Sequence, residues 1–141
     1  MAQFDMKKSI GKNRSQTTKR CEIKKVLDFS TINAGAGAGN GDTVLFCKTP
    51  KNYVHSACHV ILETAKGGAG TIDIGTAAAA NGMLNDGNIN GTPGATIALA
   101  GTEAGIPAGT LLSETDLQIL FNQATVAGKV TILLLGFIVE R

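Results

Sequence analysis

The chain is 141 residues long, which is enough for one domain with a buried core. It contains 18 glycines, five phenylalanines, one tyrosine and no tryptophan, so small and β-branched side chains must fill most of that core. Its three cysteines are odd in number and show no CxxC spacing, which argues against a disulfide framework and against a zinc ribbon. We expect reduced, structural thiols in a protein made in a cytosol.

The formal net charge of +2 conceals a strongly basic start. Residues 1–25 contain eight basic and two acidic residues, whereas residues 26–141 contain five basic and nine acidic residues. Residues 1–24 show no strand or helix periodicity, and we predict a basic extended arm there, followed by a β-sandwich domain at 25–141. Such an arm binds an acidic partner or, in the free chain, stays solvated. The candidate contact residues are Lys7, Lys8, Lys12, Arg14, Lys19, Arg20, Lys24 and Lys25.

After the arm, short apolar segments alternate with glycine and asparagine at the spacing of an all-β sandwich. In the segment TIDIG the alternation places Ile72 and Ile74 inward and Asp73 outward. The last segment is apolar on both faces, which is typical of a strand in the middle of a sheet. The predicted strands are Lys25–Phe29, Thr43–Lys48, Tyr53–Thr64, Thr71–Gly75, Ala95–Ala100, Thr110–Leu112, Asp116–Phe121 and Lys129–Glu140.

Two long connections separate these strands, Ile32–Asp42 and Thr76–Gly94. The first is glycine-rich, as phosphate-binding loops are, but a dinucleotide fingerprint would need glycine where Asn40 and Asp42 stand. A strand pattern rather than a helix follows it, and no G-K-[ST] sequence occurs in the chain. We therefore interpret it as a pliable connection that lets the first strand and the arm reach a neighbouring subunit. The second connection is long enough to contact a partner.

The histidines and a cysteine of Tyr53–Thr64 are the best candidates for a metal site. On a regular strand His55 and His59 share one face, about 13 Å apart at roughly 3.3 Å per residue, and Cys58 points to the other face. The chain has no further histidine to complete a site, so we expect no metal and no cofactor. The two histidines are predicted to line a half-exposed sheet face or a subunit contact.

Patterns of catalysis and membrane targeting are also missing from the sequence. It has no G-x-S-x-G elbow, although a glycosidase-like pair of carboxylates stays open because two acidic residues can always meet in space. Scarce aromatic side chains disfavour base stacking, so we expect no specific nucleic-acid binding. The start MAQFDMKKSI lacks a signal-peptide core, and Thr131–Val139 is too short to span a bilayer. We predict a protein that is no enzyme and contacts no membrane.

Two stretches resemble structural proteins of tailed-bacteriophage virions. In VHSACHVILETAKGGAGTIDIGTAAAANGML a strand is followed by a G-G-x-x-T-x-D-x-G turn and strand, then by a loop of small residues. The ending DLQILFNQATVAGKVTILLLGFIVE resembles their close, with a strand, a short turn at Ala127–Lys129 and a long final strand. The resemblance covers residues 42–140. The residues that carry the first match are Gly67, Gly68, Thr71, Asp73 and Gly75.

The resemblance implies a head decoration (cement) or other minor capsid protein, with an antiparallel, jelly-roll-like β-sandwich and an extended N-terminal arm. Such a protein is expected to be a homotrimer that binds the major capsid protein and like subunits and stabilises the head shell. Made in the host cytoplasm, it would lie on the capsid surface of the virion. The alternative is a receptor- or glycan-binding module of a phage head fibre or tail fibre, which the scarcity of tyrosine and tryptophan disfavours.

Overall fold

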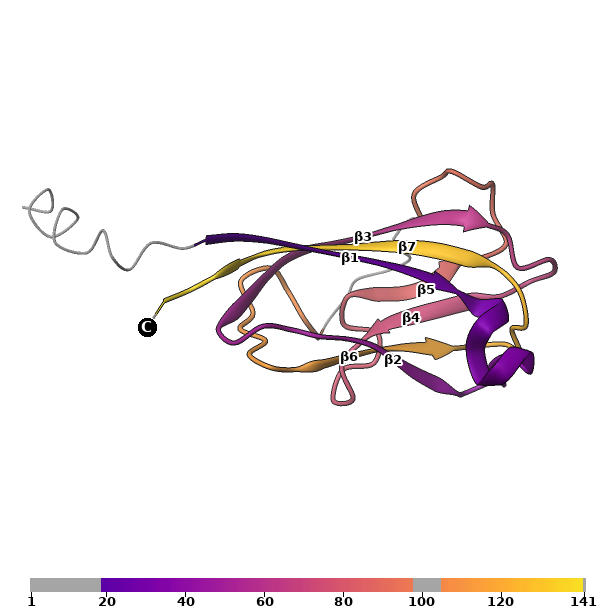
Figure 1. Cartoon of the computed structure of the whole chain (residues 1–141), viewed down its shortest axis with the longest axis horizontal. Helices are drawn as coiled ribbons and strands as arrows, with labels where there is room; N and C mark the ends of the chain where they lie inside the picture. Colours follow the sequence, from indigo (N-terminus) through magenta and orange to yellow (C-terminus); the bar gives the residue numbers. More distant parts are fainter. Residues whose placement is uncertain (1–18, 98–104, 141) are drawn as a thin grey trace, which may run out of the picture.

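The computed structural model describes residues 19–97 and 105–140. Within them, two packed sheets of antiparallel strands confirm the predicted all-β antiparallel sandwich (Figure 1). The three-stranded sheet has the order β1–β7–β3, and the four-stranded sheet has the order β2–β6–β4–β5. No helix within the described ranges is long and apolar enough to cross a membrane. The elements are β1 (Lys19–Asp28), the 3₁₀ helix η2 (Phe29–Gly35), β2 (Thr43–Lys48), β3 (Tyr53–Thr64), β4 (Thr71–Gly75), β5 (Leu84–Asn88), β6 (Asp116–Phe121) and β7 (Lys129–Ile138).

The last strand, β7, lies in the middle of the three-stranded sheet, as its two apolar faces predicted. It pairs with β1 on one side and with β3 on the other. Its inward side chains Val130, Ile132 and Leu134 are completely buried. They belong to a single core between the sheets, in which the rings of Phe29 and Phe121 meet edge to face with their centroids 5.2 Å apart.

The first strand is longer than predicted. β2, β3, β4 and β6 occupy the predicted ranges, but β1 begins at Lys19 rather than Lys25. Residues 19–24, which the sequence pattern assigns to the arm, therefore belong to the sandwich. Only one face of β1 contacts the core. The charged residues of its other face interrupt the apolar pattern by which a strand is recognised from sequence.

The predicted connection Thr76–Gly94 contains a strand of its own. β5 pairs with β4 and forms an edge of the four-stranded sheet. Its sequence, LNDGN, consists mostly of residues that are rare in strands. Tertiary pairing with β4 overrides that weak local preference, so the prediction of an unstructured connection is wrong.

Isolated bridges take the place of two other predicted strands. Within residues 110–112, Leu111 forms a single bridge with Val54 of β3. Near residue 95, Thr96 forms a single bridge with Ile61 of the same strand. The remainder of that second predicted strand, residues 98–100, lies outside the described residues. Both bridges cover parts of the edge that β3 does not share with β7.

A β-bulge in β3 changes which side chains face the core. The register with β7 shifts between His55 and Ala57, so that His55 and Cys58 both face inward and His59 faces outward. The prediction that the two histidines share a face opposite Cys58 is therefore wrong. A bulge adds one residue to a strand and reverses the alternation beyond it, and the extra residue, Ser56, leaves no mark on the apolar pattern.

The glycine-rich connection is folded against one end of the sandwich. Its helix η2 begins at Asp28, whose carboxylate accepts a hydrogen bond of 3.0 Å from the backbone N–H of Ser30. Farther along, Ala38 and Thr125 exchange two backbone hydrogen bonds of 2.8 Å. Gly37 is packed so closely that an added Cβ would contact the carbonyl oxygen of Thr125 at 2.4 Å. These contacts contradict the prediction of a pliable joint.

Asp73 points outward from β4, as predicted, yet it is only 8% exposed. Its Oδ1 atom accepts hydrogen bonds from the backbone N–H of Asp86, at 2.7 Å, and from Nδ2 of Asn122, at 3.3 Å. The hydrogen bonds satisfy the carboxylate where solvent does not reach it. Asp73 therefore fastens β4 to β5 and β6 rather than serving as a free surface charge.

Candidate interaction surface

Half of the predicted contact residues lie on β1. Lys19, Arg20, Lys24 and Lys25 all belong to this strand. β1 is an edge strand, because it is hydrogen bonded to β7 on one side and pairs with no described strand on the other. The predicted contact residues outside the described ranges are Lys7, Lys8, Lys12 and Arg14.

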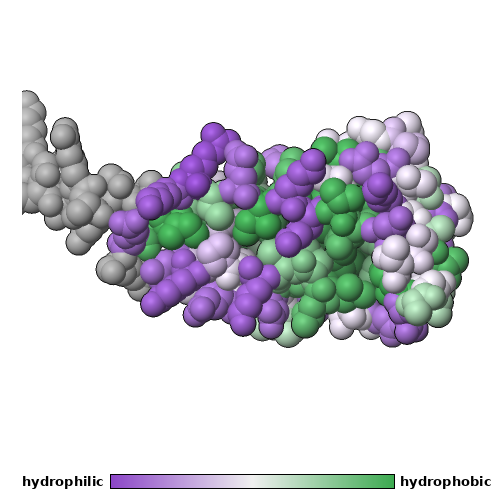
Figure 2. Space-filling view, in the orientation of Figure 1, coloured by the Kyte–Doolittle hydropathy of each residue, from purple (hydrophilic) through white to green (hydrophobic). Residues whose placement is uncertain are grey.

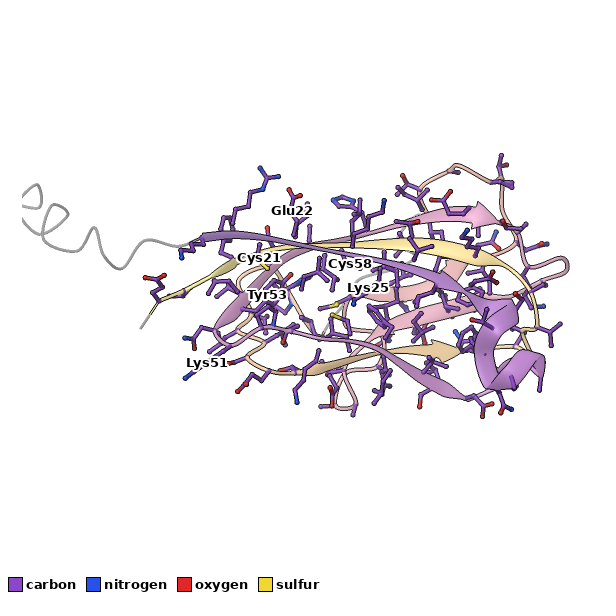
Figure 3. The ribbon with its side chains drawn as sticks, in the orientation of Figure 1. Cys21, Glu22, Lys25, Lys51, Tyr53 and Cys58 are labelled. Atoms are coloured by element: carbon purple, nitrogen blue, oxygen red, sulfur yellow. The ribbon has the colours of Figure 1, made fainter. Side chains whose placement is uncertain are left out.

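The basic residues of β1 divide between the two faces of the three-stranded sheet. Arg20 and Lys24 alternate with Glu22 on the face that points away from the four-stranded sheet. Lys25 lies opposite the buried Ile132 and so faces the four-stranded sheet. Figure 3 shows Glu22 and Lys25 on opposite sides of the β1 ribbon. The outward residues form the part of the predicted basic surface that the structure brings together.

Two of the basic residues pair with carboxylates of the same chain. The Lys19 Nζ atom lies 3.4 Å from Oε1 of Glu140, and the Arg20 guanidinium lies 2.8 Å from Oε1 of Glu22. All four side chains are 45% or more exposed, so solvent weakens both ion pairs. Lys24 makes no ion pair with any described residue and remains available to an acidic partner.

An apolar line runs beside these charges along the outer face of the three-stranded sheet. Phe137 of β7 is 43% exposed, and Val26 of β1 is 51% exposed. A surface that is apolar at its centre and charged at its border has the composition of a protein interface. The outer face, as the term is used below, comprises Arg20, Glu22, Lys24, Val26, Leu133, Leu135, Phe137, Val54, His59 and Ile61.

The predicted contact residues do not include Phe137. The sequence does contain a sign of it, because both faces of β7 are apolar. A strand in the middle of a sheet is expected to bury both faces, so this pattern did not point to an exposed contact residue. In the described part of the chain no second layer covers that face. The side chains are therefore shielded only by their neighbours within the sheet, and they remain partly exposed.

The cysteines lie near Tyr53 on the inner face of the sandwich and form no disulfide (Figure 3). Burial raises the pKa of Tyr53 to about 12, and the nearby Cys21, Cys58 and Cys47 add to the shift. Burial also raises the pKa of Cys58 to about 12 and shifts the pKa of Cys47 upward. Both of these thiols therefore stay protonated at neutral pH, which makes them poor nucleophiles.

The histidines occupy separate environments. His55 is buried, and its Nδ1 atom has no hydrogen-bond partner among the described residues. Burial lowers the pKa of His55 and favours the neutral ring. His59 lies on the opposite face of the same sheet, so the two side chains point away from each other. The described residues contain no group of three His, Cys, Asp or Glu side chains arranged to hold a metal ion.

A cavity of about 390 Å³ lies beside β3. His55 and Cys58 contribute to its wall together with the apolar side chains of Met83, Ile97 and Ile106. His59 also belongs to the wall, and no described Asp, Glu, Lys or Arg lines the cavity. The wall of the cavity is therefore mostly apolar.

The glycine-rich connection holds a carboxylate of its own. The backbone N–H of Gly39 donates a hydrogen bond of 2.7 Å to Oδ2 of Asp42. Loops that bind phosphate direct such amides toward the bound anion. Here Asp42 supplies the anion, which agrees with the sequence argument against a phosphate site.

No protein-family model and no curated protein matches the sequence. A comparison of folds finds similarity to a chain of the "Cyanophage Pam1 capsid asymmetric unit", with a TM-score of 0.56 and 13% sequence identity. The similarity covers 86% of this chain and 84% of that chain. The two chains are thus similar in length, and what they share at this identity is the fold.

Proposed function

We propose that this chain is a structural protein of a phage virion. The observation that carries the proposal is the fold that it shares, over 86% of its length, with a chain of the cyanophage Pam1 capsid asymmetric unit. The sequence resemblance to structural proteins of tailed-phage virions points in the same direction and rests on separate observations.

The strand order supports this proposal. Most connections along the chain pass from one sheet to the other, and the orders β1–β7–β3 and β2–β6–β4–β5 follow the winding of a jelly roll. The bridges at Thr96 and Leu111 stand where an eighth strand would pair with β3. Jelly rolls with two packed sheets are common in viral capsid proteins, although lectin domains use them too.

Within the virion we infer the role of a decoration or cement protein, a homotrimer on the capsid surface that binds the major capsid protein. The outer face supplies an apolar centre for such a contact, and Arg20 and Lys24 supply positive charge at its border. Basic side chains steer a protein toward an acidic surface and make the encounter sensitive to salt. The basic residues of the arm would extend the same contact.

We infer a non-enzymatic role. The two thiols with resolved shifts and the hydroxyl of Tyr53 are held in their protonated forms by burial. The ring of His55 is held neutral inside the core. Active sites instead adjust such groups toward the pH at which they transfer protons or attack a substrate.

A particle-binding experiment tests the proposal. Phage heads prepared without this protein are mixed with the purified chain, sedimented and imaged to locate any added density. We expect saturable binding at repeated positions on the shell, and binding that weakens as the salt concentration rises. A chain that binds a glycan array and no particle would overturn the proposal in favour of the receptor-binding alternative.

A charge-reversal pair tests the contact itself. Lys24→Glu places a negative charge on the outer face and is expected to weaken particle binding about tenfold, equivalent to roughly 1.4 kcal/mol. Lys48→Glu reverses an exposed lysine of the four-stranded sheet and serves as the matched control. Equal loss of binding in both variants would show that total charge matters and that the outer face does not.

A further inference from the structure

The chain contains three asparagines that are directly followed by glycine, a pair that is prone to spontaneous chemistry. The pairs are Asn40–Gly41, Asn81–Gly82 and Asn90–Gly91. In such a pair the backbone nitrogen of the glycine can attack the side-chain amide carbon of the asparagine, because glycine has no Cβ to hinder the approach. All three asparagines are exposed to solvent, so exposure does not distinguish between them.

The hydrogen bonds of the glycine amides do distinguish the three pairs. The N–H of Gly41 donates to the carbonyl oxygen of Phe121 at 2.7 Å, and the N–H of Gly82 donates to the carbonyl oxygen of Ala79 at 3.0 Å. The N–H of Gly91 donates to no described residue. An amide held in a hydrogen bond must be released by local opening before its nitrogen can attack. The fold therefore protects the first two pairs and leaves the third able to react.

The side chain of Asn90 is held beside a hydrogen-bond donor. Its Oδ1 atom accepts a hydrogen bond of 2.9 Å from the backbone N–H of Gly67. A donor at this position stabilises the negative charge that the oxygen gains when the amide carbon is attacked. The preceding residue, Ile89, is completely buried, and its backbone is hydrogen bonded to Lys66 and Gly70. These bonds keep the asparagine next to the Gly67 donor.

The loop that carries this pair lies on the surface. Residues 89–97 follow the end of β5 and form the loop at the upper right of Figure 1. Figure 2, in the same orientation, shows this corner of the molecule as mostly neutral or hydrophilic. Water and hydroxide therefore have access to the pair, and the chemistry needs both of them.

We propose that Asn90–Gly91 is a site of self-catalysed covalent modification. Hydroxide takes the proton of the Gly91 N–H, and the nitrogen forms a bond to Cγ of Asn90. The Cγ–Nδ2 bond then breaks, and the departing nitrogen takes a proton from water and leaves as ammonia. Water opens the resulting succinimide ring at either carbonyl carbon. One opening yields aspartate, and the other yields isoaspartate, in which the main chain runs through the former side chain.

The modification changes a loop that is anchored on both sides. Ile89 is held before the pair, and the N–H of Gly94 donates to the carbonyl oxygen of Leu62 at 2.6 Å after it. Either product adds a negative charge to the chain, and isoaspartate also lengthens the backbone between the two anchors. This chemistry belongs to the isolated chain, so it is independent of the function proposed above.

Peptide mapping of the folded full chain tests the proposal. The protein is incubated at mildly alkaline pH and then cut before its aspartate residues, which places Asn40, Asn81 and Asn90 in separate peptides. We expect the mass of the deamidated form to accumulate at Asn90 at least about tenfold faster than at the other two, whose glycine amides must first open. In urea the three rates should become similar. Equal rates in the folded chain, or the same order of rates in urea, would overturn the proposal.

A pair of variants identifies the attacking atom. Gly91→Ala adds a Cβ whose nearest atoms lie 3.8 Å away, so the fold should be kept, while the added methyl group should slow the reaction at Asn90 at least about fivefold by steric hindrance. Thr92→Ala changes the next exposed residue, keeps the glycine and is the matched control, which should react as fast as the unaltered chain. An undiminished rate in Gly91→Ala would overturn the proposed attack.

The products provide an independent readout of the same step. Opening of a succinimide gives both aspartate and isoaspartate, whereas direct hydrolysis of the side chain gives aspartate alone. Cleavage before aspartate recognises the first product and passes over the second, so the digest counts the two separately. We expect both at position 90, and aspartate alone would refute the ring intermediate.

Discussion

Gly136 makes room for the ring of Tyr53 in the three-stranded sheet. A Cβ at this position would lie 2.5 Å from Cε2 of Tyr53 and 2.4 Å from the carbonyl oxygen of Val54. Because Tyr53 is completely buried, we expect Gly136→Ala to lower the free energy of unfolding by about 1–3 kcal/mol in urea denaturation. Gly91→Ala, whose Cβ would meet its nearest atoms at 3.8 Å, is the control and should shift stability by less than about 0.5 kcal/mol. Equal stability of the two variants would contradict this reading of the packing.

His55 links stability to pH. Burial lowers its pKa below the ordinary value of 6.5, so the unfolded chain takes up a proton at a higher pH than the folded chain does. The free energy of unfolding is therefore undiminished above pH 6.5 and falls as the pH drops from there toward the lowered pKa. In denaturation curves recorded on both sides of pH 6.5, His55→Gln should flatten this dependence. His59→Gln, which removes the outward histidine, should retain it, and a wild-type slope in His55→Gln would refute the link.

At the scale of elements, β1 sets where the chain can be shortened. Removing residues 1–18 leaves β1 whole, whereas removing residues 1–24 also takes away the partners of residues 133–138 in β7. We expect the longer deletion to be less stable by at least about 2 kcal/mol, because strand hydrogen bonds and the contacts of Cys21 and Ile23 are lost. Urea denaturation of the two truncated chains measures the difference. Matching midpoints would mean that residues 19–24 are not held in the sandwich.

Alternation predicts a strand only where one face is apolar and the register is regular. β2, β4 and β6 satisfy both conditions and lie where the sequence placed them. β3 was located with its correct ends, but the bulge at Ser56 made its faces unpredictable beyond His55. β5 is rich in asparagine and glycine, and β1 carries charges on one face, so in both cases long-range pairing rather than local preference decides the structure.

For the whole molecule, the two sides of β7 have different roles. Leu134 is completely buried in the core, and Leu134→Ala should lower the free energy of unfolding by about 2–5 kcal/mol. Phe137 lies on the outer face, and Phe137→Ser should cost less than about 1 kcal/mol while it weakens particle binding. Calorimetry and sedimentation with particles separate the two effects. Loss of folding in Phe137→Ser, or undiminished binding, would contradict the division.

The candidate surface could be foreseen only in part. Charge counting predicted Arg20 and Lys24 as candidate contact residues, because charge is a property of the sequence itself, and the structure places both on the outer face. It could not separate them from Lys25, which lies on the same strand and faces the other sheet. The apolar contribution of Phe137 depends on whether a further layer covers β7, and that is decided by the number and arrangement of all the strands together.

The position of β7 also governs when the protein can fold. β1 and β3 do not pair with each other, so their sheet cannot form until residues 129–138 have been synthesised, after every other strand. Pairing between segments so far apart in the sequence makes folding slow. While the ribosome completes the chain, the edges of β1 and β3 stay open to misassociation, which is a characteristic hazard of incomplete folding intermediates. Synthesis interrupted before residue 129 therefore yields a chain whose first and third strands lack β7, the strand that joins them.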